Sequence, residues 1–197
     1  MVEESVEFRG YLFKKEPTLE IIDTNRTITQ AQIKKLLEGK DGEKLKKNLP
    51  IKDVNKFLKE KFGIEDWNQV EEKYRWIKAK LPTVKGKSGI YLWVVDGDPI
   101  YIGQALDLYD RFNRDYLQIS PKNLAEDGQA TNLKMNYFLL LCILVGVTVD
   151  IYFYEVIGFD KYNKEERKRL KDILDNIESD LIKGSVKEGV ILLNDRI

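Results

Sequence analysis

The fold is decided by residues 89–103, whose sequence is GIYLWVVDGDPIYIG. Two runs of β-branched and aromatic residues flank a turn signal at 96–98, a pattern typical of a β-hairpin. With a three-residue loop, Tyr91 lies opposite Gly103, Tyr91 and Tyr101 share one face, and the other face is aliphatic. A two-residue loop would place a tyrosine in the aliphatic layer, so the pattern predicts the odd loop. On the hairpin alone, aromatic cover of a half-buried sheet explains the tyrosine face better than catalysis does.

A helix is expected directly after the hairpin, over residues 105–117. Its apolar stripe includes Leu108 and Phe112 at helical spacing. Arg111 lies at the edge of this stripe. It therefore either turns toward the sheet or extends past the core as an ordinary surface arginine.

Residues 164–183 show a long amphipathic pattern, in which one charged residue interrupts the apolar stripe. The stripe consists of Leu170, Ile173, Leu174, Ile177, Leu181 and Ile182. Glu178 occupies the remaining position, where an ionised carboxylate is costly unless it is paired, hydrogen-bonded or metal-bound. The helix alone leaves open an ion pair with an arginine, a narrower stripe or a metal ligand. The other acids of the segment, Asp175 among them, fall off the stripe and are expected in solvent.

The composition excludes several classes of enzyme. The chain has 197 residues and no histidine, which removes Ser-His-Asp and Cys-His catalysis and histidine metal ligands. Its single cysteine, Cys142, lies in an apolar run and suits a reducing compartment. The longest uncharged apolar run, residues 137–149, is too short to span a bilayer. Because no signal-like segment is seen, a soluble cytoplasmic protein without membrane association is expected.

Charge is distributed unevenly along the chain. The 33 Lys and Arg balance the 33 Asp and Glu, but residues 26–61 hold 11 basic against 5 acidic residues. Apolar spacing predicts that 1–85 is a basic, mostly helical region that follows a short strand at 6–13. Its helices are expected at 29–37, 51–62 and 66–80. Its lysines form either a solvated face or a phosphate-contacting surface that includes Lys44, Lys46 and Lys47.

Five separated elements of the chain resemble the signature of the GIY-YIG nuclease family. They are Gly89-Ile90-Tyr91, Tyr101-Ile102-Gly103, Arg111 on the following helix, Glu178 on a late helix, and Asn194 near the C-terminus. Residues 119–123 and 131–132 also resemble an insertion in a subset of bacterial and phage members. The resemblance covers about residues 86–197 and leaves 1–85 unexplained.

The resemblance implies an α/β (α+β) nuclease domain at 86–197. In this family a small three-stranded, mainly antiparallel sheet is flanked by helices, and the third strand is expected at 148–156. Members hydrolyse DNA phosphodiester bonds with one divalent metal ion. A metal-dependent DNA endonuclease is therefore the leading hypothesis, with residues 1–85 as a region of possible DNA contact.

The resemblance also implies a role for each matched residue. Glu178 would hold Mg²⁺ or Mn²⁺, and Arg111 would bind the scissile phosphate. Tyr91 would deprotonate the attacking water, with Tyr101 orienting that water or sharing the role. Tyrosine, with an ordinary pKa near ~10, is a poor base unless positive charge lies nearby. The remaining matched residues, Gly89, Gly103 and Asn194, are expected to support the site.

The chain departs from the family at two positions. Members often carry a histidine or tyrosine four residues after the arginine, where this chain has Asp115. Some carry a lysine directly after the second motif, where this chain has Gln104. Lys122 and Lys134, in the insertion, are candidates to supply positive charge toward DNA. The alternative function is a GIY-YIG domain that cuts weakly or not at all and acts as a DNA-binding or regulatory module.

Overall fold

An antiparallel sheet and a long helix carry most of the residues that the sequence singles out. The computed structural model describes residues 5–15, 19–29, 73–81, 84–117, 130–144 and 146–194. The chain divides into two units. The first consists of Met1–Leu19, Leu81–Arg111 and Val147–Ile197, and the second of Glu20–Lys80 and Phe112–Gly146. Each unit therefore combines segments from both sides of residue 85.

The first unit is built on a five-stranded sheet. Its strands, in spatial order, are β1 (Ser5–Phe8), β2 (Tyr11–Lys15), β7 (Val149–Glu155), β5 (Gly89–Val95) and β6 (Asp98–Ala105). All neighbouring strands pair antiparallel. The mixed α+β class is thus confirmed, and so are the hairpin at 89–103 and the strand near 148–156.

The sheet contains two strands more than the expected three, because residues 5–15 join it. The segment expected as a single strand at 6–13 turns back at Arg9 and Gly10, which have φ values of 53° and 82°. Two consecutive residues of positive φ make a tight hairpin turn. The second strand then pairs with β7 through Lys14 and Phe153, which covers an edge whose peptide groups would otherwise lack partners.

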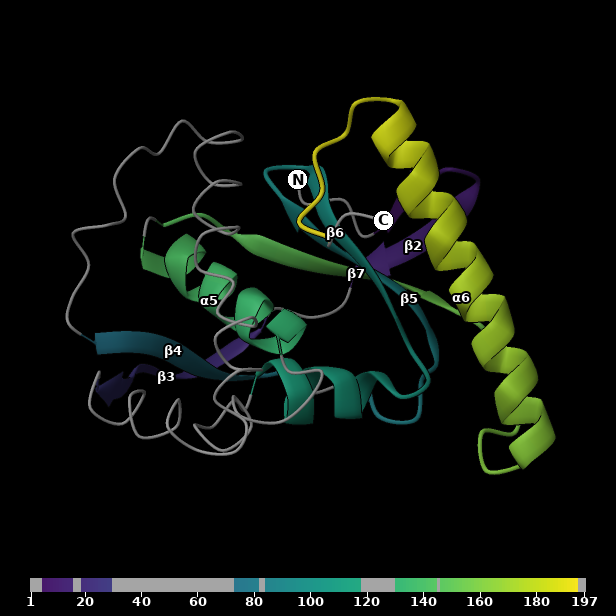
Figure 1. The fold of residues 1–197 in the computed structure, drawn as a ribbon, viewed down its shortest axis with the longest axis horizontal. Helices are drawn as coiled ribbons and strands as arrows, with labels where there is room; N and C mark the ends of the chain where they lie inside the picture. Colours follow the sequence, from purple (N-terminus) through teal and green to yellow (C-terminus); the bar gives the residue numbers. More distant parts are fainter. Residues whose placement is uncertain are drawn as a thin grey trace. The chain divides into compact units, whose positions relative to one another are not determined.

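The helix α6 (Lys164–Lys187) confirms the amphipathic pattern and lies against one face of this sheet (Figure 1). It begins after Asn163, whose side chain accepts hydrogen bonds from two backbone amides of the first turn. The core between helix and sheet consists of Phe13, Ile90, Leu92, Val94, Ile102, Tyr152, Leu170, Leu174, Leu181 and Ile182. The aliphatic face of the hairpin is therefore the face that packs against α6.

The second unit contains β3 (Glu20–Thr29), β4 (Lys73–Lys80) and α5 (Ala130–Leu144). The helix expected at 66–80 is wrong over residues 73–80, which form a strand paired with β3. Ile77 and Ala79 are buried, whereas Lys78 and Lys80 between and after them are not. This period of two is the pattern of a strand, and the pairing with β3 stabilises it over the helical alternative.

The expectation of a mostly helical N-terminal region is not matched by the described part of 1–85, which forms strands. The helices expected at 29–37 and 51–62 fall almost wholly outside the described residues. None of the helices in the described ranges combines the length and apolar character that a bilayer crossing requires.

Candidate functional site

The hairpin of β5 and β6 brings the two tyrosines of the signature together on one face. Tyr91 pairs with Gly103, and Trp93 pairs with Tyr101, as the sequence predicts. The rings of Tyr91 and Tyr101 stack at a centroid distance of 6.3 Å and an interplanar angle of 26°. Tyr91 is 0% exposed and Tyr101 is 6% exposed. The two hydroxyl-bearing rings therefore form one layer on the face opposite to α6.

The hairpin reaches this arrangement by a different turn from the expected one. Val95 pairs with Asp98, so the loop has two residues, Asp96 and Gly97, with φ values of 52° and 86°. A register shift between Trp93 and Val94 adds one residue to β6. Because such a β-bulge restores the parity that the shorter loop removes, the predicted faces are retained.

Both glycines of the signature are required by close approaches of other groups. A Cβ atom at Gly103 would lie 2.4 Å from the Tyr91 ring and hydroxyl. At Gly89 it would lie 2.0 Å from the carbonyl oxygen of Tyr154 on the neighbouring strand. Gly103 therefore makes room for the Tyr91 side chain, and Gly89 allows β5 to approach β7.

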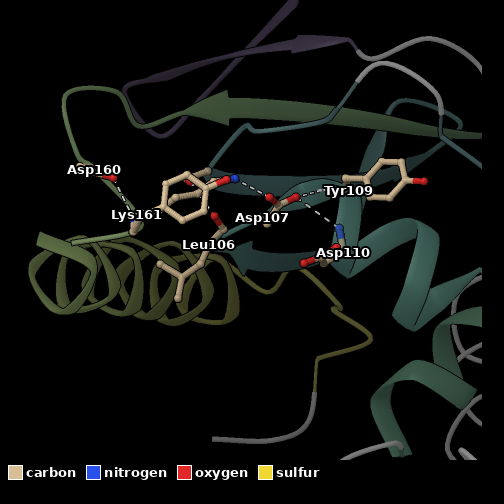
Figure 2. Close-up of polar contacts among 8 residues, drawn as sticks. Leu106, Asp107, Tyr109, Asp110, Asp160 and Lys161 are labelled. Atoms are coloured by element: carbon tan, nitrogen blue, oxygen red, sulfur yellow. Dashed lines mark hydrogen bonds and ion pairs between the residues drawn. The ribbon is translucent and has the colours of Figure 1, made fainter. Parts of the chain in front are cut away.

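Asp107 fixes the start of the helical turn that carries Arg111. This π-helical turn, η1 (Asp110–Tyr116), follows β6 and begins later than the helix expected at 105–117. The Asp107 Oδ1 atom accepts hydrogen bonds from the amides of Tyr109 (2.9 Å) and Asp110 (3.3 Å). Figure 2 shows Asp107 between these amides and Lys161, which forms an ion pair with Oδ2. The turn is thus capped by a carboxylate.

Arg111 turns toward the sheet and meets Tyr91. Its backbone N–H donates to the carbonyl oxygen of Asp107 at 3.0 Å. Its side chain Nε donates to Tyr91 Oη at 3.2 Å. This geometry decides between the two positions that the sequence left open for Arg111, and it places a permanent positive charge against the buried hydroxyl.

Glu178 lies on α6 at the edge of the buried stripe and is partly exposed. Burial raises the pKa of its carboxyl group, and the nearby Asp175 raises it further. Arg111, a hydrogen bond from Gln104, and Lys171 all act in the opposite direction. The stripe is narrower than drawn from the sequence, because Ile173 is 37% exposed. Glu178 therefore lies close enough to Arg111 for the guanidinium charge to act on its carboxyl group.

Gln104 and Asp175 belong to this site, although sequence reasoning gave them no role in it. The Gln104 side chain donates to Asp175 Oδ1 and is also hydrogen-bonded to Glu178. Lys171 forms an ion pair with Asp175 at 2.9 Å. Asp175 is exposed, as expected, and in addition takes part in these contacts. The signal in the sequence was its position three residues before Glu178, on the same side of a helix.

Asn194 holds the strand that carries the second motif. Its Oδ1 atom accepts from the N–H of Ile102 at 3.0 Å, and its Nδ2 donates to the carbonyl oxygen of Ile102 at 2.6 Å. The preceding residue, Leu193, donates its N–H to the carbonyl oxygen of Ile100 at 2.6 Å. Since β6 is an edge strand, these bonds satisfy outer peptide groups of Ile100 and Ile102. They thereby hold the strand that carries Tyr101 and Gly103 in place.

The basic residues expected to contact DNA fall on parts of the chain whose side chains the structure does not describe. Lys44, Lys46, Lys47 and Lys122 lie outside the described residues. Lys134 falls on α5 in the second unit, and its side chain is likewise outside the description.

The chemistry of the site suits a hard divalent cation held by few protein ligands. No group of three or more acidic or cysteine residues that could hold a metal occurs in the described ranges. Glu178 and Asp175 nevertheless supply two neighbouring carboxylates, and burial, followed by the charge of Asp175, raises the pKa of Glu178. Mg²⁺ is commonly bound through one or two carboxylates together with water. The residues present therefore fit such an ion at Glu178.

Comparisons of the chain with models of protein families, with curated proteins and with solved structures found no match.

Proposed function

We propose that the chain is a metal-dependent endonuclease of the GIY-YIG type that hydrolyses DNA phosphodiester bonds. The proposal is carried by the convergence of Tyr91, Arg111 and Glu178. Arg111 donates to Tyr91 Oη, and its charge acts on the Glu178 carboxyl group. Phosphodiester hydrolysis needs a base, a cation for the phosphate and a carboxylate for a metal ion. The single, buried Cys142 supports a cytoplasmic setting.

Tyr91 is the proposed general base, and Arg111 controls its availability. In the structure the Tyr91 hydroxyl accepts a hydrogen bond from Arg111. A DNA phosphate attracts the guanidinium group more strongly than a neutral hydroxyl does, because the donor and the acceptor of the hydrogen bond are then both charged. Binding of the phosphate by Arg111 therefore frees the Tyr91 hydroxyl to accept a proton-bearing partner, the attacking water. Tyr101 orients this water or shares the proton transfer.

Glu178 is the proposed ligand of Mg²⁺ or Mn²⁺. Its carboxylate lies beside Asp175, and two carboxylates in one place create a negative potential that attracts a cation. Gln104 restrains both carboxylates through hydrogen bonds. When bound, such an ion neutralises the scissile phosphate and stabilises the leaving oxygen.

The alternative is a DNA-binding or regulatory module that cuts weakly or not at all. One observation favours it: Tyr91 is 0% exposed, so its hydroxyl does not face bulk water in this structure. The two functions differ in their dependence on Glu178, because DNA binding without cleavage requires no catalytic carboxylate.

The test is cleavage of plasmid and branched DNA with Mg²⁺, Mn²⁺ or EDTA. Glu178→Gln keeps the size of the side chain and removes its charge, and we expect it to lower the cleavage rate by about a hundredfold or more. Asp180→Asn, an exposed acid on the same helix, is the matched control and should cut at the normal rate. Cleavage that survives Glu178→Gln, or that occurs in EDTA, would disprove the catalytic proposal. DNA binding without any cleavage by the unmodified protein would establish the alternative.

A further inference from the structure

The half of α6 that leads to Glu178 carries a row of cationic side chains. Lys164, Arg167, Lys168 and Lys171 follow one another at spacings of three and four residues, and all four are exposed. Residues at these spacings lie on one side of a helix. Continuing the row by the same steps leads to Asp175 and then to Glu178.

Contacts in the structure tie this row to the site. The Lys171 ammonium group lies 2.9 Å from both carboxylate oxygens of Asp175, and its charge lowers the pKa of Glu178. Lys171 therefore joins the row of cations to the two carboxylates of the site, Asp175 and Glu178. We call the four exposed cations the basic flank of α6.

The basic flank works against the stability of the helix on two counts. Lys164 and Lys168 are like charges four residues apart, and so are Arg167 and Lys171, which is a destabilising arrangement. Lys164 is also the first residue of α6, where the helix dipole disfavours positive charge. A solvated face needs neither feature. Both unfavourable terms vanish when an anion lies along the flank.

The acidic residues of the same turns neutralise the flank only in part, because Lys164 and Arg167 have no acidic residue three or four positions away within α6. Glu166 accepts a hydrogen bond from the backbone N–H of Asp160 at 2.7 Å and points to the preceding loop. Glu165 and Asp172 are three and four residues from Lys168, which places both acids beside that one cation. Next to the flank, Tyr162 is 88% exposed, with the Lys161 ammonium 5.8 Å from its ring centroid.

We propose that the basic flank of α6 binds the phosphate backbone of duplex DNA and leads it to Glu178, an inference that rests on the proposed nuclease function. At 1.5 Å per residue, the helix from Lys164 to Glu178 spans about 21 Å, or about six base pairs of duplex. The DNA strand therefore contacts the flank on one side of the scissile phosphate only. Duplex binding then depends on α6 as well as on any contact made by the N-terminal lysines.

The test measures the binding of a fluorescently labelled DNA duplex in EDTA at several salt concentrations. The variant carries Lys164→Gln and Lys168→Gln, and the matched control carries Arg169→Gln and Lys183→Gln. The control residues are exposed cations of the same helix that helical spacing places away from the flank. We expect the flank variant to reduce the slope of log affinity against log salt by about two. At 0.1 M salt its affinity should fall by about tenfold to a hundredfold, and the control should bind normally.

Circular dichroism of each variant establishes that the helices are retained. An unchanged slope in the flank variant, an equal loss in the control, or no duplex binding by the unmodified protein would overturn the proposal. Displacement of the duplex by polyglutamate at equal charge concentration would overturn its assignment to DNA. Binding is read without a metal ion, so it is independent of catalysis. Duplex binding that weakens as expected, together with cleavage that survives Glu178→Gln, would leave the flank in place and remove the proposed nuclease mechanism.

Discussion

Each of the two units contains an asparagine whose side-chain amide forms two hydrogen bonds with the backbone of one isoleucine. In the second unit, Asn136 accepts from the N–H of Ile77 at 3.0 Å and donates to its carbonyl oxygen at 2.9 Å. In the first unit, Asn194 makes the same pair of bonds to Ile102. We call each of these pairs of hydrogen bonds an asparagine clamp. The two clamps have the same bonding pattern but differ in burial, since Asn136 is 0% exposed and Asn194 is partly exposed.

This difference distinguishes Asn136, which stabilises the fold, from Asn194, which also positions the candidate site. Asn136 makes a third bond, to the carbonyl oxygen of Tyr116 at 2.8 Å, so all of its polar atoms are engaged in a water-free place. Its role is to hold its own unit together. Asn194 holds the residue between Tyr101 and Gly103, where small displacements change the tyrosine layer. Burial therefore predicts where stability is lost, and position predicts where activity is lost.

The largest effect on stability is expected from Asn136→Ala. The substitution leaves the N–H and carbonyl of Ile77 and the carbonyl of Tyr116 buried without this partner, at a cost of about 1–3 kcal/mol for each unsatisfied group. We expect a loss of about 3 kcal/mol or more in the free energy of unfolding by urea. Asn176→Ala, at an exposed position of α6, is the control and should change it by less than about 0.5 kcal/mol. Equal losses for the two variants would contradict the comparison.

A smaller loss of stability, with a larger loss of activity, is expected from Asn194→Ala. Water can replace the amide at this partly exposed edge, so we expect about 1 kcal/mol in urea unfolding. The edge strand loses its clamp at Ile102, and cleavage should fall by about tenfold because the adjacent tyrosines are no longer held in position. Normal cleavage by a variant that is destabilised as expected would show that Asn194 serves the fold alone.

The smallest effect on stability concerns Glu178, a partly buried carboxylate on α6. Its pKa is raised in the folded protein above the ordinary value of 4.5, so the folded state binds more protons than the unfolded state above that pH. The contribution of Glu178 to stability therefore falls as pH rises through this window, and Glu178→Gln should remove this part of the pH dependence. In EDTA, the variant should be the more stable protein at neutral pH, and the two should converge below about pH 4. A variant that is less stable at neutral pH would contradict the cause assigned to the pKa shift.

The hairpin and α6 could be predicted because their patterns are local. Alternation in residues 89–103 and the apolar stripe of 164–183 each specify which side chains share a face, whatever else the chain does. The strand at 73–80 was missed because its apolar residues fit both periods, and pairing with β3 decided between them. The β-bulge was missed because it arises from the balance of a two-residue turn against the packing of both faces.

The site residues also divide into those that a local sequence pattern revealed and those that only the packed structure revealed. Glu178 stood out in the sequence because it conflicts with its apolar stripe, and Tyr91 and Arg111 stood out because they match the GIY-YIG signature. Gln104 and Asp175 did not, since an amide after a strand and an acid off an apolar stripe are ordinary in sequence. Their connection exists only where β6 and α6 pack together.

The sequence by itself determined the hairpin, the amphipathic helix and the residues that do not belong in them, because side-chain periodicity and the cost of burying charge act within a few residues of chain. Only the tertiary structure decided that residues 5–15 enlarge the sheet, that Arg111 turns to Tyr91, and that Asn194 closes the edge of β6. These outcomes depend on hydrogen bonds between groups far apart along the chain, whose partners are selected only when the elements pack.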